Sequence, residues 1–549
     1  MRPENRRSQG TTDVRLGRSP ALFIRLVLLI FLSRRATMVK SSNSNNLLLT
    51  TLIGTALAAR FIYVLNRDAL IDDVYITFRY AQNILQGEGI VYNLGESVYG
   101  ASSPLYTFLF AGIAALFSKD ALSLLAPWIG SLSLIGCVVV LWRSLPLTLF
   151  ARTVMAIGLL SYPRIFYASV GGMEECAILF LMGLSIAAHL RRRPFWLGVI
   201  CALLFMTKID TLVWVACIFL VESISEKKFP WKVLLVALIV SLPWTLYGLA
   251  QYGSIIPHTV EAKRIAYVHP GGLKPLDAVL FTVPEAFTGS PLVVLLYAVV
   301  VYGTLGIALY RSIKTKDLLF LLFPLYCLGY TVLLFFSGTS LGLWERWTVP
   351  HWGMFLVTFG YVLSSTGSLA RLHLGSSLKH TVLITLLLLH IGGLSASFIY
   401  PFRMSPDPKS SREVGTWLRG HATPNQSVLL EPIGLIGYLS NLYVHDFIGL
   451  ISPQVTQARK VVPSSNRWYF QYIRQWLPTF IVLREREVHE NEFMYGGYGD
   501  AIFLPTEKKW FDDEYALVFQ TAHGSATERL LIYANKHQTR QPEPVRAED

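Results

Sequence analysis

Charged residues are scarce in this sequence. Asp, Glu, Lys and Arg make up 15% of its 549 residues, whereas hydrophobic residues make up 53% and the mean hydropathy is +0.45. A soluble globular chain carries about 25% charged residues. The apolar residues also gather in runs long enough to cross a bilayer. The composition therefore excludes an ordinary soluble domain and predicts a polytopic α-helical membrane protein.

Cysteine is equally scarce. The chain has five cysteines, and all of them fall in or beside apolar segments: Cys137, Cys176, Cys201, Cys217 and Cys327. The hydrophilic region beyond residue 400 has none, so it cannot contain a disulfide, and no metal-type cysteine spacing is present. We expect the five to be buried as small hydrophobic side chains.

The net charge of +13 does not indicate nucleic-acid binding, because most Lys and Arg lie in short loops beside the apolar runs. Residues 1–45 are basic and poor in acids, and we interpret them as a disordered cytosolic tail. Within this tail, residues 21–32 are apolar but too short to span a bilayer, and they lack a small-residue cleavage site. Either Met1 or Met38 could be the first residue of the translated protein.

About eleven apolar segments are predicted to span the membrane. They are residues 47–65, 121–142, 146–162, 174–190, 195–207, 211–222, 232–250, 291–310, 317–337, 348–366 and 379–400. Basic clusters such as Arg191–Arg193, Lys227 with Lys228, and Arg311 with Lys314 follow several of them. The positive-inside rule places these clusters, and the N-terminus, in the cytosol. With an odd number of spans, residues 401–549 then lie outside.

Two segments are too short for ordinary spans. Residues 104–117 are apolar, but the segment is too short to cross the bilayer. Its length favours a re-entrant or interfacial segment on the outer face. Residues 195–222 have basic clusters at both ends, which predicts a hairpin whose polar tip, Lys208-Ile209-Asp210, points outward. Because its arms are short, the tip lies below the outer membrane surface and must face protein or a water-filled cavity.

The chain thus divides into the basic tail, a transmembrane catalytic domain at residues 46–400 with a first external loop at 66–120, and an extracytoplasmic domain at 401–549. In this last domain residues 411–420 read as a helix. Residues 427–431, 479–484, 516–520 and 530–533 read as strands, which predicts a small α/β domain.

This topology gathers ionisable residues on the outer side of the membrane. They are Asp72, Asp73, Arg79, Glu88, Glu96, Glu174, Glu175, Lys208, Asp210, Lys263, Arg264, Glu345 and Arg346. Cations bind a phosphate ester, with Arg offering a planar fork and Lys a point charge. A carboxylate can remove the proton of an attacking hydroxyl. The mixture is typical of a transferase that acts on a phosphate-linked substrate.

Each of these residues also has a structural interpretation. Asp72 or Asp73 precedes a predicted helix at 75–85 and could be its N-cap. Glu174 or Glu175 could stabilise a helix N-terminus, and Lys208 and Asp210 could pair with each other. The charges of Lys263 and Arg264 could be solvated. Arg346 could instead extend its charged end to the membrane interface, beside neighbouring tryptophans.

The first external loop resembles that of the C-type (GT-C) glycosyltransferases, in particular the terminal arabinofuranosyltransferases of cell-wall arabinan. The resemblance rests on Asp72-Asp73-Val-Tyr-Ile-Thr-Phe-Arg79-Tyr80-Ala-Gln-Asn83, Gly87-Glu88-Gly89, Asn93-Leu-Gly95-Glu96 and Gly100-Ala-Ser-Ser-Pro104-Leu105. Weaker matches follow in order: Gly171-Gly172-Met173-Glu174, Thr207-Lys208-Ile-Asp210, Tyr252-Gly253-Ser-Ile-Ile-Pro257-His258-Thr259 with Ala262-Lys263, Arg346 with Pro350, Glu431-Pro-Ile-Gly434-Leu-Ile-Gly437-Tyr438 and Asp446-Phe-Ile-Gly449-Leu450.

This resemblance implies a GT-C-like membrane fold and an inverting transfer from a polyprenyl-phosphate sugar donor to a cell-envelope glycan or lipid acceptor. It further implies that Asp72 or Asp73 is the base and that Glu174 shapes the acceptor side or a metal site. The implied substrate ligands are Arg79, Lys208, Asp210, Lys263, Arg264 and Arg346. The implied location is a bacterial plasma membrane.

The sequence departs from the family pattern at four positions. Tyr99 stands where an acid is usual, Lys208 where Arg is common, Ile209 where Pro is common, and His258 where Asn is usual. These changes concern the sugar and the acceptor more than the reaction type. No cofactor follows from the sequence, and a divalent metal stays open. A non-enzymatic scaffold on the same fold, and a transporter or flippase of lipid-linked sugars, are the alternative functions.

Overall fold

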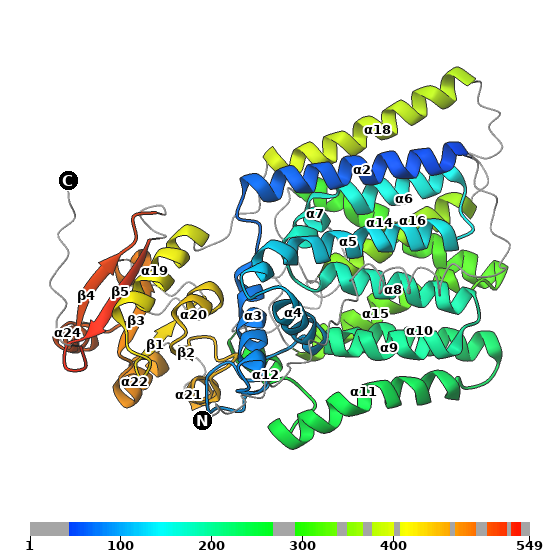
Figure 1. Cartoon of the computed structure of the whole chain (residues 1–549). Coiled ribbons are helices and arrows are strands. Elements are labelled where there is room, and N and C mark those ends of the chain that lie inside the picture. Colours follow the sequence, from blue (N-terminus) through cyan, green and yellow to red (C-terminus); the bar gives the residue numbers. More distant parts are fainter. Residues whose placement is uncertain are drawn as a thin grey trace, which may run out of the picture. The chain divides into compact units, whose positions relative to one another are not determined.

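The computed structural model describes residues 43–266, 291–337, 348–365, 376–399, 407–461, 467–489, 502–523 and 529–539. Every segment predicted to span the membrane coincides with a helix. These are α2 (Asn43–Asn66), α5 (Ala121–Ser144), α6 (Leu149–Ser161), α8 (Glu175–Leu190), α9 (Pro194–Thr207), α10 (Leu212–Glu226), α11 (Trp231–Tyr252), α14 (Pro291–Thr315), α15 (Leu319–Ser337), α16 (Val349–Ser365) and α18 (Ser376–Ile399). Helix α5 packs against α8, α8 against α9, and α9 against α11, so these helices run side by side (Figure 1).

Among the described residues, five helices are long and apolar enough to cross a membrane by themselves, namely α2, α5, α11, α14 and α18. Helix α6 and the following α7 (Pro163–Val170) form a bent pair, at 56°, that is long enough as one span. Helices α8 and α9 are apolar but shorter. The chain is therefore a polytopic helical membrane protein, and the number of eleven spans stays a prediction.

The bend between α6 and α7 explains a buried cation in the membrane part. Pro163 begins α7 and cannot donate a backbone hydrogen bond, so carbonyls at the end of α6 lose helical partners. Arg60 of α2 donates to one of them, Leu160 O, at 3.1 Å, and to Ser169 Oγ at 2.7 Å. It also donates to Ala56 O in its own helix. The guanidinium thus ties α2 to the bent pair with its hydrogen bonds made inside the protein.

The predicted first external loop contains two helices, α3 (Asp72–Leu85) and α4 (Pro104–Leu116). The segment predicted to be re-entrant or interfacial is α4, which has a proline in its first turn. Its buried face, with Tyr106 and Phe110, packs against Phe78 of α3. The two helices share one small core, so the loop is an ordered element.

The C-terminal region folds around a five-stranded sheet with strand order β2-β1-β3-β5-β4. The strands are β1 (Ser427–Leu430), β2 (Tyr443–Asp446), β3 (Phe480–Arg484), β4 (Tyr515–Gln520) and β5 (Leu530–Asn535). Strands β2, β1 and β3 are parallel, with Val428 opposite Val444 and Phe480; β5 is antiparallel to β3 and β4. The predicted helix and four predicted strands are confirmed, and β2 is the strand that the sequence prediction missed.

Helices cover both faces of this sheet. They are α19 (Pro408–His421), α20 (Gly434–Ser440), α21 (Pro453–Val461), α22 (Arg467–Trp476), α23 (Glu485–His489) and α24 (Pro505–Glu514). Alternate strand residues point to opposite faces. Val428, Leu430 and Val482 belong to one core cluster, whereas Leu429 and Ile481 belong to the other. The first of these clusters also contains Tyr80, Tyr92 and Trp244, so the sheet domain and the first external loop share a hydrophobic core.

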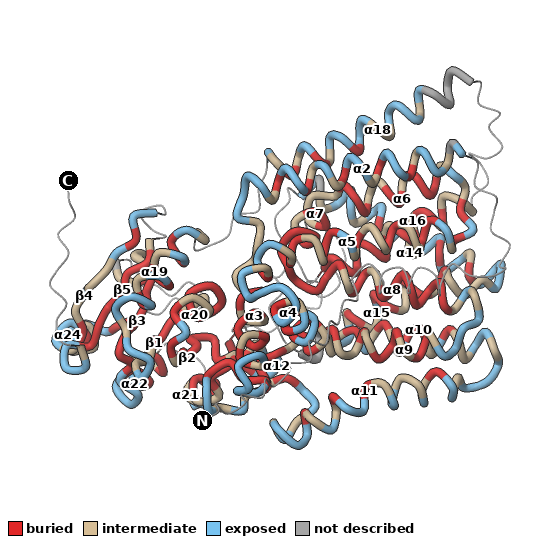
Figure 2. The backbone as a smooth tube through the Cα atoms, viewed as in Figure 1, coloured by how far each residue is buried: buried red, intermediate tan, exposed pale blue. Residues whose placement is uncertain are grey.

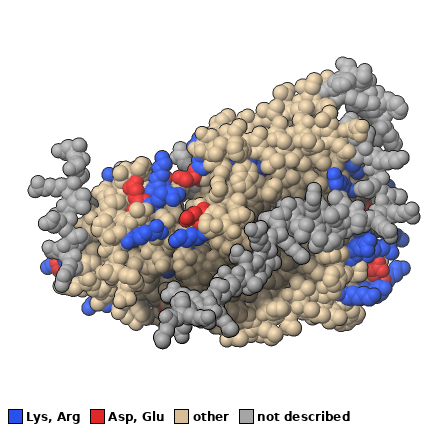
Figure 3. Space-filling view, viewed as in Figure 1, with Lys and Arg blue, Asp and Glu red and all other residues tan. Residues whose placement is uncertain are grey.

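Burial and charge both indicate a lipid-facing surface. Only 17% of the residues in the apolar windows of α11, α14 and α18 are buried, and Figure 2 shows these helices largely in the colours of exposed and intermediate residues. On the face in Figure 3, charged side chains gather toward the two ends, and the surface between them is almost free of charge. All five cysteines are buried, as predicted.

The buried cysteines allow a labelling test of orientation. We expect E88C in the first loop and K509C in α24 to react in intact cells with a membrane-impermeant maleimide, and K228C only after permeabilisation. All three native side chains are exposed. Mass-tag gel shifts would measure the reaction. Opposite accessibility of E88C and K509C would contradict the predicted topology.

Candidate active site

Asp72 and Asp73 form the first turn of α3. Neither acid is the N-cap of this helix, which was the structural alternative for them, because α3 begins at Asp72 and its N-cap residue is Ile71. Asp72 instead accepts hydrogen bonds from the amides of Gly434 at 2.7 Å and Leu435 at 2.9 Å, at the start of α20. A Cβ on Gly434 would collide with Asp72, so only glycine fits there. The Asp72 carboxylate thus links the first loop to the sheet domain.

Asp72 is partly buried. Burial raises the pKa of its carboxyl to about 6, although the two amides of α20 favour the charged form. At neutral pH the carboxylate is still ionised and can accept both bonds. Asp73 lies next to it in the chain and is half-buried, and neither α20 amide bond involves it. Of the two acids, Asp72 has a clear structural task.

Arg79 is buried, with 2% of its surface exposed. Its guanidinium donates to the carbonyls of Tyr92 at 2.9 Å, Gly437 at 2.8 Å and Leu442 at 2.6 Å. It also lies over the ring of Tyr92, 4.1 Å from the centroid. Two of the three carbonyls belong to the sheet domain. The structure therefore gives Arg79 a structural role, in contrast to the predicted substrate ligand.

Residues 92–96 complete the contact between loop and sheet domain. Tyr92 donates its hydroxyl to Ile433 O at 2.6 Å. The Asn93 amide bonds both the N–H and the C=O of Val444 in β2, at 3.0 and 2.9 Å. Glu96 accepts from the hydroxyl of Tyr443 at 2.6 Å. The sequence reasoning assigned no role to Tyr92 and Asn93, because their partners lie some 340 to 350 residues away in the chain.

A second charged group lies at the carboxyl ends of β1 and β3. Arg484 pairs with both Glu431 and Glu487 and is 2% exposed. Burial raises the pKa of Glu431 to about 7, while Arg484 opposes the shift and the nearby charges of Glu487 and Asp72 add to it. Sequence reasoning missed this cluster as well, because nothing in the local sequence pairs these three residues.

Glu174 and Lys208 come together from different helices. Glu174 precedes α8 and is 3% exposed, and Lys208 follows α9. Their side chains form an ion pair at 3.1 Å. Glu174 makes no side-chain cap bond to α8, so the charge of Lys208 is its described partner. The structure thus joins Glu174 to Lys208 of the predicted hairpin tip.

Asp210 lies in the short 3-10 helix η1 (Ile209–Thr211) that joins α9 and α10. It accepts a hydrogen bond from the hydroxyl of Tyr330 in α15 at 2.9 Å. The Tyr330 ring in turn contacts His351 of α16, with centroids 4.3 Å apart. The predicted hairpin break is confirmed, and its tip faces protein, as the cost of bare charge in lipid demands.

The remaining predicted cations differ in position. Lys263 and Arg264 lie in α12 (His258–Ala266), where Lys263 is half-buried and Arg264 is exposed. Arg264 lines a cleft of ≈ 460 Å³ together with Tyr99 and Tyr252. Arg346 lies outside the described residues, so its predicted role is untested.

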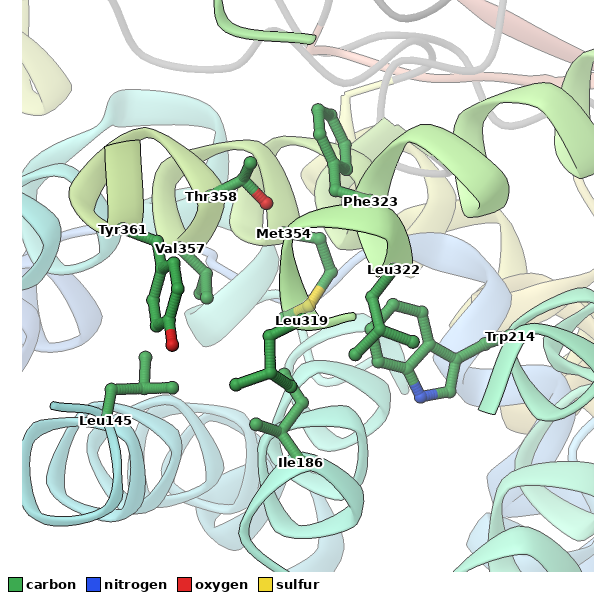
Figure 4. Close-up of a pocket in the computed structure, with 10 residues that line it drawn as sticks. All are labelled: Leu145, Ile186, Trp214, Leu319, Leu322, Phe323, Met354, Val357, Thr358 and Tyr361. Atoms are coloured by element: carbon green, nitrogen blue, oxygen red, sulfur yellow. The ribbon is translucent and has the colours of Figure 1, made fainter. Parts of the chain in front are cut away.

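Two further observations bear on possible ligands. Within the part of the chain that the structure describes, no group of three or more His, Cys, Asp or Glu side chains is placed to hold a metal ion. We assign no step to a metal. The cavity shown in Figure 4 lies between helices of the membrane part, is lined by residues such as Leu322, Met354 and Trp214, and has a volume of ≈ 20 Å³. This is room for about one water and not for a substrate.

The structure thus combines a bundle of apolar helices, an ordered loop after α2 and a C-terminal sheet domain. The solved structure of ArnT from Cupriavidus metallidurans bound to undecaprenyl phosphate is similar, with a TM-score of 0.55 and 12% identity, over 90% of this chain and 99% of that one. The apo state of the same protein has a TM-score of 0.53, also at 12% identity, over 89% and 97%.

The sheet domain has its own match. Residues 403–538 match the family model described as Domain of unknown function (DUF8728). No curated protein matches the chain. The structural neighbours thus share the fold over about nine-tenths of the chain, while the roles of individual residues rest on the geometry above.

The Arg79 contacts predict a loss of stability on a conservative change. Arg79→Lys keeps the charge but loses the planar fork that bonds three carbonyls. Leaving about two buried carbonyls unpaired should cost about 2–4 kcal/mol. We expect a lower apparent Tm in detergent and faster tryptic release of the sheet domain. Arg67→Lys, at an exposed site, is the matched control. Equal melting of the two variants would contradict the structural role of Arg79.

Proposed function

We propose that this protein is an inverting glycosyltransferase that moves a sugar from a polyprenyl-phosphate donor to a cell-envelope glycan or lipid acceptor. The observation that carries the proposal is the ion pair between Glu174 and Lys208, two residues before Asp210, together with Asp73 in the first turn of α3. The similarity of the fold to ArnT, solved with undecaprenyl phosphate, supports a donor of this chemical type.

The proposed reaction is a single displacement. The carboxylate of Asp73 removes the proton of an acceptor hydroxyl, and the oxygen attacks the anomeric carbon of the donor sugar. The bond between that carbon and the phosphate oxygen breaks with inversion, and polyprenyl phosphate leaves. A nearby cation stabilises the charge that develops on the phosphate. Lys263 is the described candidate for this task, with Arg346 as the candidate outside the described residues.

Asp73 is a better base than Asp72 in this proposal. The two amides of α20 already occupy both oxygens of Asp72. A proton taken by Asp72 would cost one of these bonds, because a protonated oxygen no longer accepts equally well. Asp73 lies outside that arrangement. Glu174, paired with Lys208, then orients the hairpin tip and shapes the acceptor side.

The proposal places the reaction on the outer face of a bacterial plasma membrane, with the sheet domain outside the cytosol. The resemblance to arabinofuranosyltransferases suggests a pentose or hexose donor. A non-enzymatic scaffold is the second candidate function, and the structural roles of Asp72 and Arg79 favour it, because these motif residues would be retained without catalysis.

Substitution of Asp73 separates the two functions. We expect Asp73→Asn to lower transfer by at least about 10²-fold, since the general base is removed, while expression and melting stay unchanged. The measurement uses membranes and a radiolabelled polyprenyl-phosphate sugar. Asp68→Asn, at an exposed acid in the same loop, is the control. Full activity of Asp73→Asn would remove it as the base, and a lack of any transfer by the wild type would favour the scaffold.

A further inference from the structure

The cleft beside Arg264 is the largest cavity described above, and the proposed chemistry does not use it. Its walls come from three separate parts of the chain. Residues 97–99 of the first loop form one wall, and the turn after α11 with helix α12 forms the second. Pro453, which begins α21 of the sheet domain, closes the third side. Its volume of ≈ 460 Å³ falls within the range of small-ligand sites, about 300–1,000 Å³.

The walls are fixed to one another. The His258 amide donates to Tyr99 O at 2.9 Å, which joins α12 to the first loop. The His258 ring contacts Thr456 of α21 at 3.1 Å, which joins α12 to the sheet domain. Tyr99 stacks on Tyr252 with centroids 4.9 Å apart, and its hydroxyl accepts from Trp244. The cleft is therefore a preformed site.

The described lining of the cleft includes one acid, Glu261, and one Arg, Arg264. Glu261 is balanced by Lys460, whose ammonium lies 2.5 Å away. Burial lowers the pKa of His258, so its ring is neutral at pH 7. Arg264 makes no ion pair with another described residue, and it lines the cleft one turn after Glu261. Its guanidinium is thus the unbalanced charge, and its planar fork suits a carboxylate or a phosphate.

The lining combines polar and apolar side chains, and all but one of its residues lie outside the helices of the membrane part. Ser97 and Ser254 provide hydroxyls, and Tyr252, the last residue of α11, is the one lining residue that a span contributes. The guanidinium of Arg264, the two hydroxyls and the position of the cleft beyond the end of α11 favour an acidic, water-soluble ligand over a prenyl chain. We propose that this cleft binds the acceptor as an acidic glycan, with an acidic group on Arg264 and sugar rings along Tyr99 and Tyr252.

The inference rests on the proposed glycosyltransferase function and names the acceptor class for it. Arg264 then acts on the acceptor, whereas Lys263, which does not line the cleft, stays the candidate for the donor phosphate. Tyr99 and His258, which both line the cleft, are two of the four positions where the sequence departs from the pattern it resembles.

A binding test can be made without turnover. Ser97 is exposed on the cleft wall, and the native cysteines are all buried, so S97C offers one reactive thiol in the cleft. We expect trigalacturonic acid to slow its reaction with a water-soluble maleimide at least threefold in the full-length protein. Maltotriose should slow it less. Detergent-dispersed polyprenyl monophosphate should have no effect, and none of the three should protect E88C.

Two further substitutions, each added to S97C, identify the groups involved. Arg264→Gln removes the charge and Val260→Trp fills the cleft from an exposed position on α12; both should abolish the protection. Arg474→Gln and Val461→Trp, exposed and outside the cleft, should leave it intact. Protection by polyprenyl phosphate alone would make the cleft a donor site, and no protection by trigalacturonic acid would overturn the proposal.

Kinetics separate this proposal from the proposed function. If the wild type transfers sugar, Val260→Trp should raise the KM for the acceptor about tenfold and leave the KM for the donor unchanged. A rise in the donor KM instead would overturn the assignment of the cleft. If the wild type transfers nothing, the enzymatic function fails, while thiol protection by trigalacturonic acid would still show an acidic-glycan site.

Discussion

The contact between the first external loop and the backbone of the sheet domain is the constraint on which the rest of the structure depends. A buried guanidinium and a buried carboxylate are stable only when their hydrogen bonds are made. Arg79 meets this need with the carbonyls of Gly437 and Leu442, and Asp72 with the amides of Gly434 and Leu435. Arg79 and Asp72 make these hydrogen bonds only when the loop and the sheet domain are packed together. The two therefore form one structural unit, with Tyr80 and Tyr92 in the domain's own core.

This packing gives Asp72 and Arg79 their contacts to the sheet domain. Asp73, at the next position of the same helical turn, takes no part in the two α20 amide bonds. At the ends of the helices, Lys208 lies beside Glu174 and Asp210 beside Tyr330. The loop also supplies Tyr99 to the cleft that α12 and α21 complete. The sheet domain thus shapes the surroundings of the proposed reaction, although the proposed base and ion pair lie outside it.

The predictions from sequence succeed where the signal is local. Apolar runs predicted eleven helices of the membrane part but not the short α7, and alternation predicted β1, β3, β4 and β5, because side-chain periodicity is a property of neighbouring residues. Strand β2 escaped because it is four residues long and buries His445 and Asp446, so it shows no apolar pattern. Asp72 was considered as a possible N-cap of the first-loop helix, but its carboxylate accepts hydrogen bonds from the amides at the start of α20 instead. The acids and amides concerned are more than 350 residues apart, and no local pattern records such a pairing.

By itself, the sequence determined the membrane character, the helical segments, the α/β nature of the C-terminal domain and the set of ionisable residues expected outside. These follow from hydropathy, periodicity and charge, which act over a few turns of chain. Only the tertiary structure decided which of those residues make structural hydrogen bonds, which pair with each other, and where a cleft forms. Such outcomes depend on contacts between distant segments, and the cost of leaving a buried charge unpaired fixes them when the chain packs.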